Sequence, residues 1–143
     1  MIEQKLHDKA LILLANREHS RCELEQKLGK FCDNAELIQQ VLVKLIQRNL
    51  LSDERFTEQY IQMRANRGFG SERIAQELKQ RGVVAELIDE YLNKGNIDWN
   101  ERLQSTWQKR FKTRPKDYQE QSKQMRFLLY RGFTMEQIQE LFS

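Results

Sequence analysis

Proline is nearly absent from this sequence and glycine is sparse: the 143 residues contain one proline and six glycines. This composition excludes a collagen-like, low-complexity or Pro/Gly-rich linker chain. Long hydrophobic runs are absent too, since no apolar stretch approaches the roughly 18 residues that span a bilayer. The first residues lack the basic and then apolar layout of a secretion signal. We therefore expect a cytoplasmic protein with no membrane partner.

Cysteine and histidine are scarce as well, with two residues of each. Cys22 and Cys32 are too few for a disulfide framework, and with His7 and His19 they fit no spacing of a zinc finger or ribbon. Both thiols are instead expected to be small packing residues in a reducing compartment. Neither histidine has a serine or cysteine nucleophile recognisably arranged beside it. The sequence thus predicts no metal, no cofactor and no enzymatic activity.

Apolar residues recur at helical spacing, for example Phe56, Tyr60 and Met63, whereas sustained alternation with β-branched residues is missing. Capping boxes and their Asp-headed variants mark expected helix starts, at Ser20, Asp33, Asp98, Asp117 and Thr134, and Ser52 is expected to cap another helix before Asp53 and Glu54. Glycines fall where helices should stop, at Gly29, Gly68, Gly70, Gly82, Gly95 and Gly132. These signals predict an all-α protein of about nine short helices and no sheet.

The sequence repeats itself with a shift of 50 positions. The tetrapeptide Ala-Glu-Leu-Ile occurs at 35–38 and again at 85–88, and a further shift carries the Arg-Gly pair at 81–82 onto the pair at 131–132. Such matches, in register with the expected helices, favour a tandem repeat. A three-helix unit of this size buries little surface alone, so neighbouring units must share apolar faces. We predict an elongated array of three helix-turn-helix-like units, over residues 1–50, 51–96 and 97–143.

The total charge is nearly balanced, with 24 Lys and Arg against 21 Asp and Glu, so the arrangement of charges has to indicate the partner. The expected third helices at 84–92 and 134–142 carry acids and no base, which phosphates would repel. That disfavours recognition helices that enter a DNA groove, although the charge-balanced third helix of the first copy is not excluded.

Basic residues gather around a glycine-rich turn, along the acid-free run at 102–116 with interleaved aromatics, and near the C-terminal end. Cations between aromatics can bind phosphates or an acidic protein surface. A solvated helix face is the alternative for each group. The candidates for contacts with DNA or a protein partner are Arg64, Arg67, Arg73, Lys79, Arg81, Lys109, Arg110, Lys112, Arg114, Lys123, Arg126 and Arg131.

The stretch Leu-Ser-Asp-Glu-Arg-Phe at 51–56, with Gly-Phe-Gly at 68–70 and Arg-Gly at 81–82, resembles the signature of the bacterial RecX family. The resemblance covers nearly the whole chain; Ser71 and Thr57 are mild departures, where Pro and Ala are usual. It implies tandem three-helix repeats without catalytic activity. It also implies binding in the groove of the RecA filament on DNA, which restrains strand exchange, ATP hydrolysis and the co-protease function. Non-specific binding of single- and double-stranded DNA is implied as well.

Three classes of function therefore compete. The main hypothesis is a monomeric negative regulator that bridges neighbouring protomers of a RecA–DNA filament. The alternative is a tandem helix-turn-helix regulator that binds duplex DNA directly with a preference for base sequence. A plain helical adaptor without DNA contacts is the third, and its partner binding would respond little to salt. Phe69, between two glycines, is either an exposed partner contact or a core residue.

Overall fold

The computed structural model describes residues 2–94 and 96–143, and within them the chain is helical with no strand. The described residues form nine helices: α1 (Ile2–Asn16), α2 (Arg21–Leu28), α3 (Ala35–Gln47), α4 (Asp53–Asn66), α5 (Ser71–Gln80), α6 (Ala85–Asn93), α7 (Trp99–Arg110), α8 (Tyr118–Arg131) and α9 (Met135–Phe142). The all-α prediction is confirmed. Gly95, an expected helix stop, lies outside the described residues. None of these helices combines the length and the apolar character needed to cross a bilayer.

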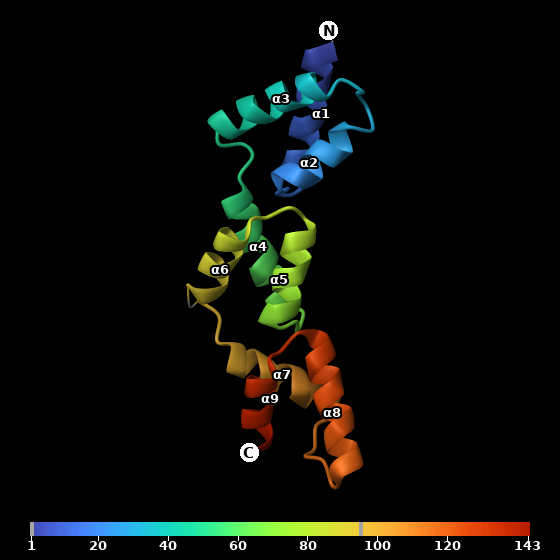
Figure 1. Ribbon diagram of the computed structural model, residues 1–143, viewed down its shortest axis with the longest axis vertical. Helices are drawn as coiled ribbons and strands as arrows, with labels where there is room; N and C mark the ends of the chain where they lie inside the picture. The colour runs from blue at the N-terminus through green and yellow to red at the C-terminus, as the bar shows by residue number, and fades with distance from the viewer. Residues whose placement is uncertain (1, 95) are drawn as a thin grey trace.

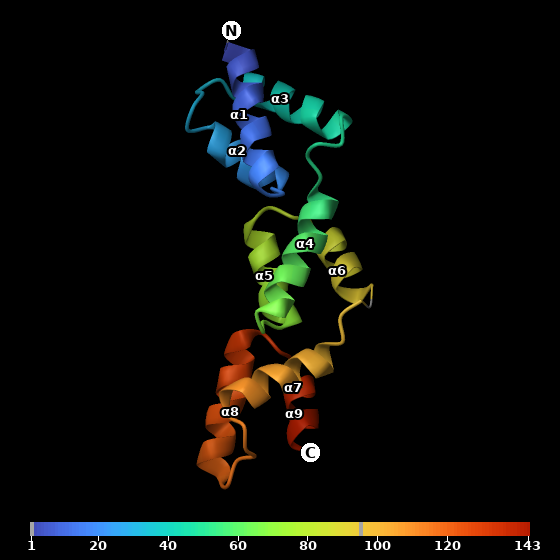
Figure 2. The ribbon, with the colours of Figure 1, turned by 180° about the vertical axis from the view of Figure 1, so that it is seen from behind.

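The helices group in threes into units that follow one another along a long axis, with the N-terminus at one end (Figures 1 and 2). The main helix–helix contacts are all between helices of the same unit. Each unit buries its own apolar core, centred on Leu28 and Leu42, on Ile74 and Leu78, and on Leu128 and Ile138. The elongated array of three-helix repeats is confirmed. The limits 1–50, 51–96 and 97–143 of separate folding units stay a prediction.

Side-chain caps set most helix starts at the expected residues. Ser20 and Thr134 form complete capping boxes before α2 and α9, which satisfy N–H groups left free by the first helical turn. The expected caps before α4, α7 and α8 accept N–H bonds in the same way. The exception is α3, whose cap is Asn34 rather than Asp33. Its side chain accepts the N–H of Leu37 because the helix begins one residue later than expected.

The units meet through the ends of their second helices. In both ribbon views α2, α5 and α8 follow one another on the same side of the molecule (Figures 1 and 2). The start of α2 meets the end of α5, and the start of α5 meets the end of α8. We call the first contact the first junction (residues 18–23 against 53–55 and 81–82). The second junction comprises residues 66–73 against 102–106 and 130–133.

Side chains and their charges make most of the first junction. Ser20 Oγ donates to the carbonyl oxygen of Arg81 at 2.7 Å. Two ion pairs and one further hydrogen bond cross the junction, formed by Arg55 with Glu18, Arg81 with Glu23, and the Arg21 N–H with Asp53. Gly82 is left-handed with φ +82°, and a Cβ there would lie 2.9 Å from Cys22 Sγ. Only glycine allows both that backbone conformation and this close approach.

Backbone groups make the core of the second junction. The N–H of Gly70 donates to the carbonyl of Arg131 at 2.8 Å, and the N–H of Glu72 donates to the carbonyl of Gly132 at 3.0 Å. The free N–H groups at the start of α5 thus satisfy free carbonyls at the end of α8. A Cβ on Gly70 would lie 2.5 Å from Gly132 O and Phe133 N, so the two backbones require glycine here.

The repeated Arg-Gly pair therefore marks a helix end that contacts the preceding unit. It occurs at 81–82 and 131–132, at the end of α5 and of α8. The equivalent positions after α2 are Phe31 and Cys32, so the Arg-Gly pair is not repeated there. Phe31 is exposed there, with the Lys9 ammonium 4.4 Å above its ring. The αL glycine cap expected at these positions is present, and its close contact with a neighbouring unit adds a second requirement.

Candidate functional site

A groove at the second junction has a charged lining that is entirely basic within the described part of the chain. Its volume is about 260 Å³, and its walls come from the end of α4, one face of α7 and the last turns of α8. The cations that line it are Arg67, Arg102, Lys109, Arg110 and Arg131. Phe127 supplies an apolar surface among them, and Ser105 and Thr106 supply hydroxyl groups. Such a lining suits an anion.

Helical spacing and one tight turn bring these side chains together. Arg102, Thr106 and Lys109 lie four and three residues apart on α7, so they share one face of that helix. Thr106 is buried, and its hydroxyl donates to the carbonyl of Gly68 at 3.4 Å. Gly68, with φ +88°, turns the chain directly after Arg67, which is the C-cap residue of α4. The α7 face is therefore fixed against the end of α4.

The guanidinium groups in the groove contact neutral atoms rather than carboxylates. Arg131 Nη1 donates to the carbonyl of Arg67 at 3.2 Å, and its guanidinium lies 5.2 Å from the ring centre of Phe127. Arg102 Nη1 donates to the side-chain oxygen of Asn66 at 2.7 Å. Among the described residues, no carboxylate oxygen comes within 4.0 Å of any of the five groove cations. None of the five cations thus forms an ion pair within the described residues.

In a second basic cluster nearby, two arginines share one acid. Nε and Nη2 of Arg64 each donate to an oxygen of the Glu77 carboxylate at 2.8 Å, and Nε of Arg73 donates to the same carboxylate at 3.2 Å. Burial by itself raises the pKa of Glu77, but hydrogen bonds from Arg64, Tyr60 and Arg73 outweigh it and lower that pKa below its usual value. Arg64 and Glu77 expose only 15% and 16% of their side chains. This cluster links α4 to α5 within the second unit.

Phe69 lies beneath these cations and packs against the second core. The guanidinium carbons of Arg64, Arg73 and Arg131 lie 3.9, 4.6 and 4.7 Å from its ring centre. Of the two roles expected for Phe69, the structure thus shows a packing residue that supports three arginines at the second junction.

The remaining sequence candidates are dispersed. Arg81 lies at the first junction beside Glu23, and Lys79 is exposed on α5. Lys112 and Arg114 are exposed in the segment between α7 and α8, and Lys123 and Arg126 are exposed on α8. The structure thus brings together Arg67, Lys109, Arg110 and Arg131 in the groove, gathers Arg64 and Arg73 with Arg131 around Phe69, and leaves the other candidates apart. Their contacts with a partner stay a prediction.

Arg102 is a groove residue that is missing from the candidate set, although it belongs to the basic run at 102–116. Its spacing of seven residues from Lys109, two helical turns, is the signal that could have placed both on one face. The hydroxyl of Thr106 left no such signal, because its contact with Gly68 joins two different units.

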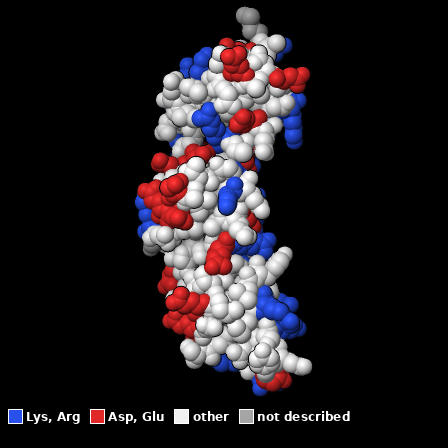
Figure 3. Space-filling model, viewed as in Figure 1, with Lys and Arg blue, Asp and Glu red and all other residues white. Residues whose placement is uncertain are grey.

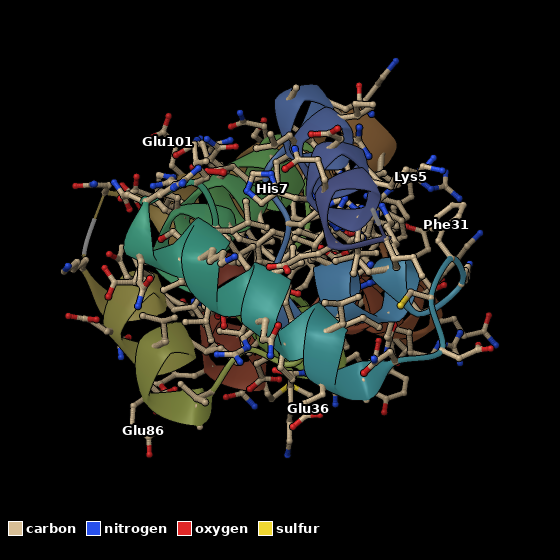
Figure 4. The ribbon with its side chains drawn as sticks, turned by 90° about the horizontal axis from the view of Figure 1, so that it is seen from above. Lys5, His7, Phe31, Glu36, Glu86 and Glu101 are labelled. Atoms are coloured by element: carbon tan, nitrogen blue, oxygen red, sulfur yellow. The ribbon has the colours of Figure 1, made fainter. Side chains whose placement is uncertain are left out.

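Acidic side chains gather on the third helix of the second unit. In Figure 3 acids gather over α6, whereas Lys and Arg gather over α8. Seen along the long axis, Glu36 of α3 and Glu86 of α6, which occupy equivalent positions in the repeat, both project outward at the lower edge of the view (Figure 4). The α6 and α9 acids are exposed, so these third helices present negative charge to solvent.

Comparisons with known proteins give the family. The models of the second and the third three-helix domain of RecX match residues 52–92 and 97–142. The regulatory protein RecX of Pseudomonas entomophila is 44% identical over 135 residues, which are 94% of this chain and 87% of the relative. The chain belongs to the RecX family. The regulatory protein RecX of Pseudomonas putida is 42% identical over 135 residues, with 94% and 86% of the two chains covered.

The RecX fold is shared at low sequence identity. The crystal structure of RecX from Lactobacillus salivarius matches with a TM-score of 0.79 at 21% identity, covering 96% of this chain and 92% of that one. Another RecX crystal structure matches with a TM-score of 0.79 at 21% identity, covering 98% and 70%. The family resemblance seen in the sequence is confirmed. RecX is a family of regulatory proteins rather than of enzymes.

Proposed function

We propose that this chain is a negative modulator of the RecA recombinase. It lies in the helical groove of the RecA–DNA filament, bridges neighbouring protomers, and inhibits ATP hydrolysis, strand exchange and the co-protease activity. Membership of the RecX regulatory family, through relatives that match 94% of the chain, carries this proposal. Such a partner places the chain in the cytoplasm.

The shape supports a polymer as the partner. Three units with separate cores form a slender body whose length exceeds that of any one unit (Figure 1). A body of this kind offers a long exposed surface rather than an enclosed substrate cavity. It can contact more than one protomer of a filament at once.

The charge distribution supports an orientation. The acidic third helices α6 and α9 would face away from DNA, while the groove cations and the exposed bases of α8 would face the nucleic acid. Bound in this way, the chain would obstruct the path of an incoming DNA strand and span the interface between protomers that binds ATP.

The decisive experiment adds the purified chain to RecA and measures DNA-stimulated ATP hydrolysis and strand exchange. We expect dose-dependent inhibition of both. An absence of inhibition at several-fold excess over RecA contradicts the proposal. Electron microscopy of the filament should then reveal additional density in its groove.

A charge-reversal pair tests the basic run. Lys109→Glu with Arg114→Glu should shift the inhibition curve to higher protein concentration, because two exposed cations that steer the approach to DNA are reversed. The matched control is Lys5→Glu with Lys30→Glu, two exposed lysines in the first unit. An unchanged curve for the first pair removes this run from the interface.

Contacts with DNA are proposed to be non-specific. The exposed acids on α6 and α9 oppose base reading by third helices. Competition between duplexes of different sequence should therefore show little preference. A preference of roughly a thousandfold for one duplex would instead support the helix-turn-helix regulator.

A further inference from the structure

We propose that the groove at the second junction is a phosphate-binding site that takes a phosphodiester group of a nucleic acid strand. We infer further that the bound phosphate ties the second unit to the third. The inference deepens the proposed function and rests on it only for naming a strand as the source of the phosphate.

The first step is the contrast in charge between the two equivalent junctions. At the first, Arg55 and Arg81 each lie beside a glutamate, at 2.6 and 3.8 Å. At the second, five cations line one groove and none is within 4.0 Å of a carboxylate among the described residues. Like charges that line one groove repel one another, so an external anion that enters the groove lowers the energy of all five.

The second step is that the donors are already in place. The Arg131 guanidinium is positioned by the Arg67 carbonyl and by the rings of Phe69 and Phe127, and Arg102 is positioned by the Asn66 side chain. Each guanidinium has five N–H donors, so donors remain free after these contacts. Their planar fork matches the oxygens of a phosphate, and little side-chain freedom is lost on binding.

The third step is the size and lining of the groove. A volume of about 260 Å³ lies below the roughly 300–1,000 Å³ of pockets that enclose a drug-sized ligand. The charged lining is basic, and Phe127 is the one aromatic residue in it. This suits a phosphate group whose attached sugars and bases remain outside. A strand presents single phosphodiester groups at regular intervals between its sugars, whereas a free nucleotide such as ATP carries its phosphates linked together at one end.

The fourth step concerns the two units. Arg67 comes from the end of α4 in the second unit, whereas Arg102, Lys109, Arg110 and Arg131 come from α7 and α8 in the third. A phosphate between them attracts both sides at once. It therefore resists opening of the junction, where the Gly70 N–H donates to the Arg131 carbonyl.

The experiment uses the full chain without recombinase. Fluorescence anisotropy of a labelled oligothymidylate measures its affinity at several salt concentrations, for the native chain and for Arg102→Gln with Lys109→Gln. We expect binding weaker by about tenfold or more. We also expect the slope of log affinity against log salt to fall by about 1.4, or about 0.7 per lost contact with a single strand.

The control variant is Lys5→Gln with Lys30→Gln, which removes the same charge from exposed sites in the first unit. Circular dichroism should confirm that both variants are folded. The inference is overturned if the groove variant has the same affinity and salt slope as the control. Displacement of the oligomer by ATP at equal phosphate concentration would overturn the assignment to a strand and give the groove to free nucleotides.

Hydrogen exchange tests the link between units. Oligothymidylate should slow exchange of the Gly70 amide in the native chain and leave it unchanged in the groove variant; equal rates with and without oligomer overturn the link. Failure of the native chain to inhibit RecA, with oligomer binding intact, would refute the proposed function and leave the phosphate site standing.

Discussion

The two junctions occupy the same place in the repeat but differ in chemistry. At the first, side chains of both signs meet across the boundary, and Ser20 Oγ donates to the Arg81 carbonyl. At the second, backbone pairs with backbone, and Gly70 stands where the first junction has serine. At the first junction Arg55 and Arg81 are paired with glutamates across the boundary. At the second junction the groove cations remain available to a ligand. The same repeat geometry therefore only joins two units at the first junction, whereas at the second it also forms a candidate binding site.

The largest effect is expected from Gly70→Ala. Its φ of −93° suits any residue, so the cost arises from the contact between a new Cβ and the backbone of Gly132 and Phe133, which cannot move aside. We expect a loss of about 3 kcal/mol in the free energy of unfolding, measured by urea denaturation. The matched change at the first junction, Ser20→Gly, should cost far less. Equal losses would show that the two junctions do not differ in this way.

Glu77→Gln should have the next largest effect. It breaks the two-bond ion pair with Arg64 and leaves a largely buried guanidinium without its partner, at about 2 kcal/mol. Because the pKa of Glu77 is lowered by folding, its stabilising effect is complete above the usual value of 4.5 and is lost as pH falls through the folded pKa. As pH is lowered into the acidic range, the free energy of unfolding should fall more steeply for the native chain than for the variant.

Glu23→Gln is the matched change for Glu77→Gln. Glu23 pairs with Arg17, whose side chain is 47% exposed, and lies 3.8 Å from Arg81. Solvent weakens such pairs, so the loss should stay below about 1 kcal/mol. A larger loss than for Glu77→Gln would reverse the ranking of the two clusters.

Ser20→Ala separates capping from the joint. Ser20 caps α2 and also donates across the first junction. Thr134 caps α9 with the same capping box and, among the described residues, makes no hydrogen bond to another unit. Each alanine variant loses a cap, at about 1 kcal/mol. Ser20→Ala should lose about 1 kcal/mol more, because the Arg81 carbonyl loses its donor. Equal urea midpoints for the two variants would show that the hydrogen bond from Ser20 to Arg81 does not contribute to stability.

The smallest effect is a dependence on pH at the first junction. Burial lowers the pKa of His19 below its usual 6.5, and the neutral ring donates from Nδ1 to the Arg17 carbonyl and accepts at Nε2 from Lys27. Below pH 6.5 the unfolded chain binds a proton that the folded chain rejects, so stability falls as pH drops toward the folded pKa. We expect a loss below about 1 kcal/mol, abolished in His19→Gln. A variant with the same pH profile as the native chain would contradict this origin.

Local signals predicted much of the fold. Capping boxes, glycine stops and the 50-residue repeat placed the helices and the three units, because each depends on residues within a few turns or on repetition along the chain. Where the signal was ambiguous the prediction was wrong, as at α3, where Asn34 and not Asp33 is the cap. The family resemblance also came from contiguous residues, so it could be recognised without coordinates.

The site was predictable only in part. The run at 102–116 identified Lys109 and Arg110, but not their proximity to Arg67 and Arg131 from two other helices. Arg64 pairs with Glu77, which lies 13 residues away in another helix. The sequence alone therefore could not distinguish an arginine that is held in an ion pair from one that is not. Asp53 likewise proved to join two units, through the N–H of Arg21.

The sequence by itself determined nine helices, their repetition and the membership of a regulatory family, since propensity, capping and motif are written in neighbouring residues. The tertiary structure decided which charges are cancelled and which remain. That outcome depends on distances of a few ångströms between residues of different units, where Coulomb energies vary steeply and where packing, rather than order along the chain, sets the neighbours.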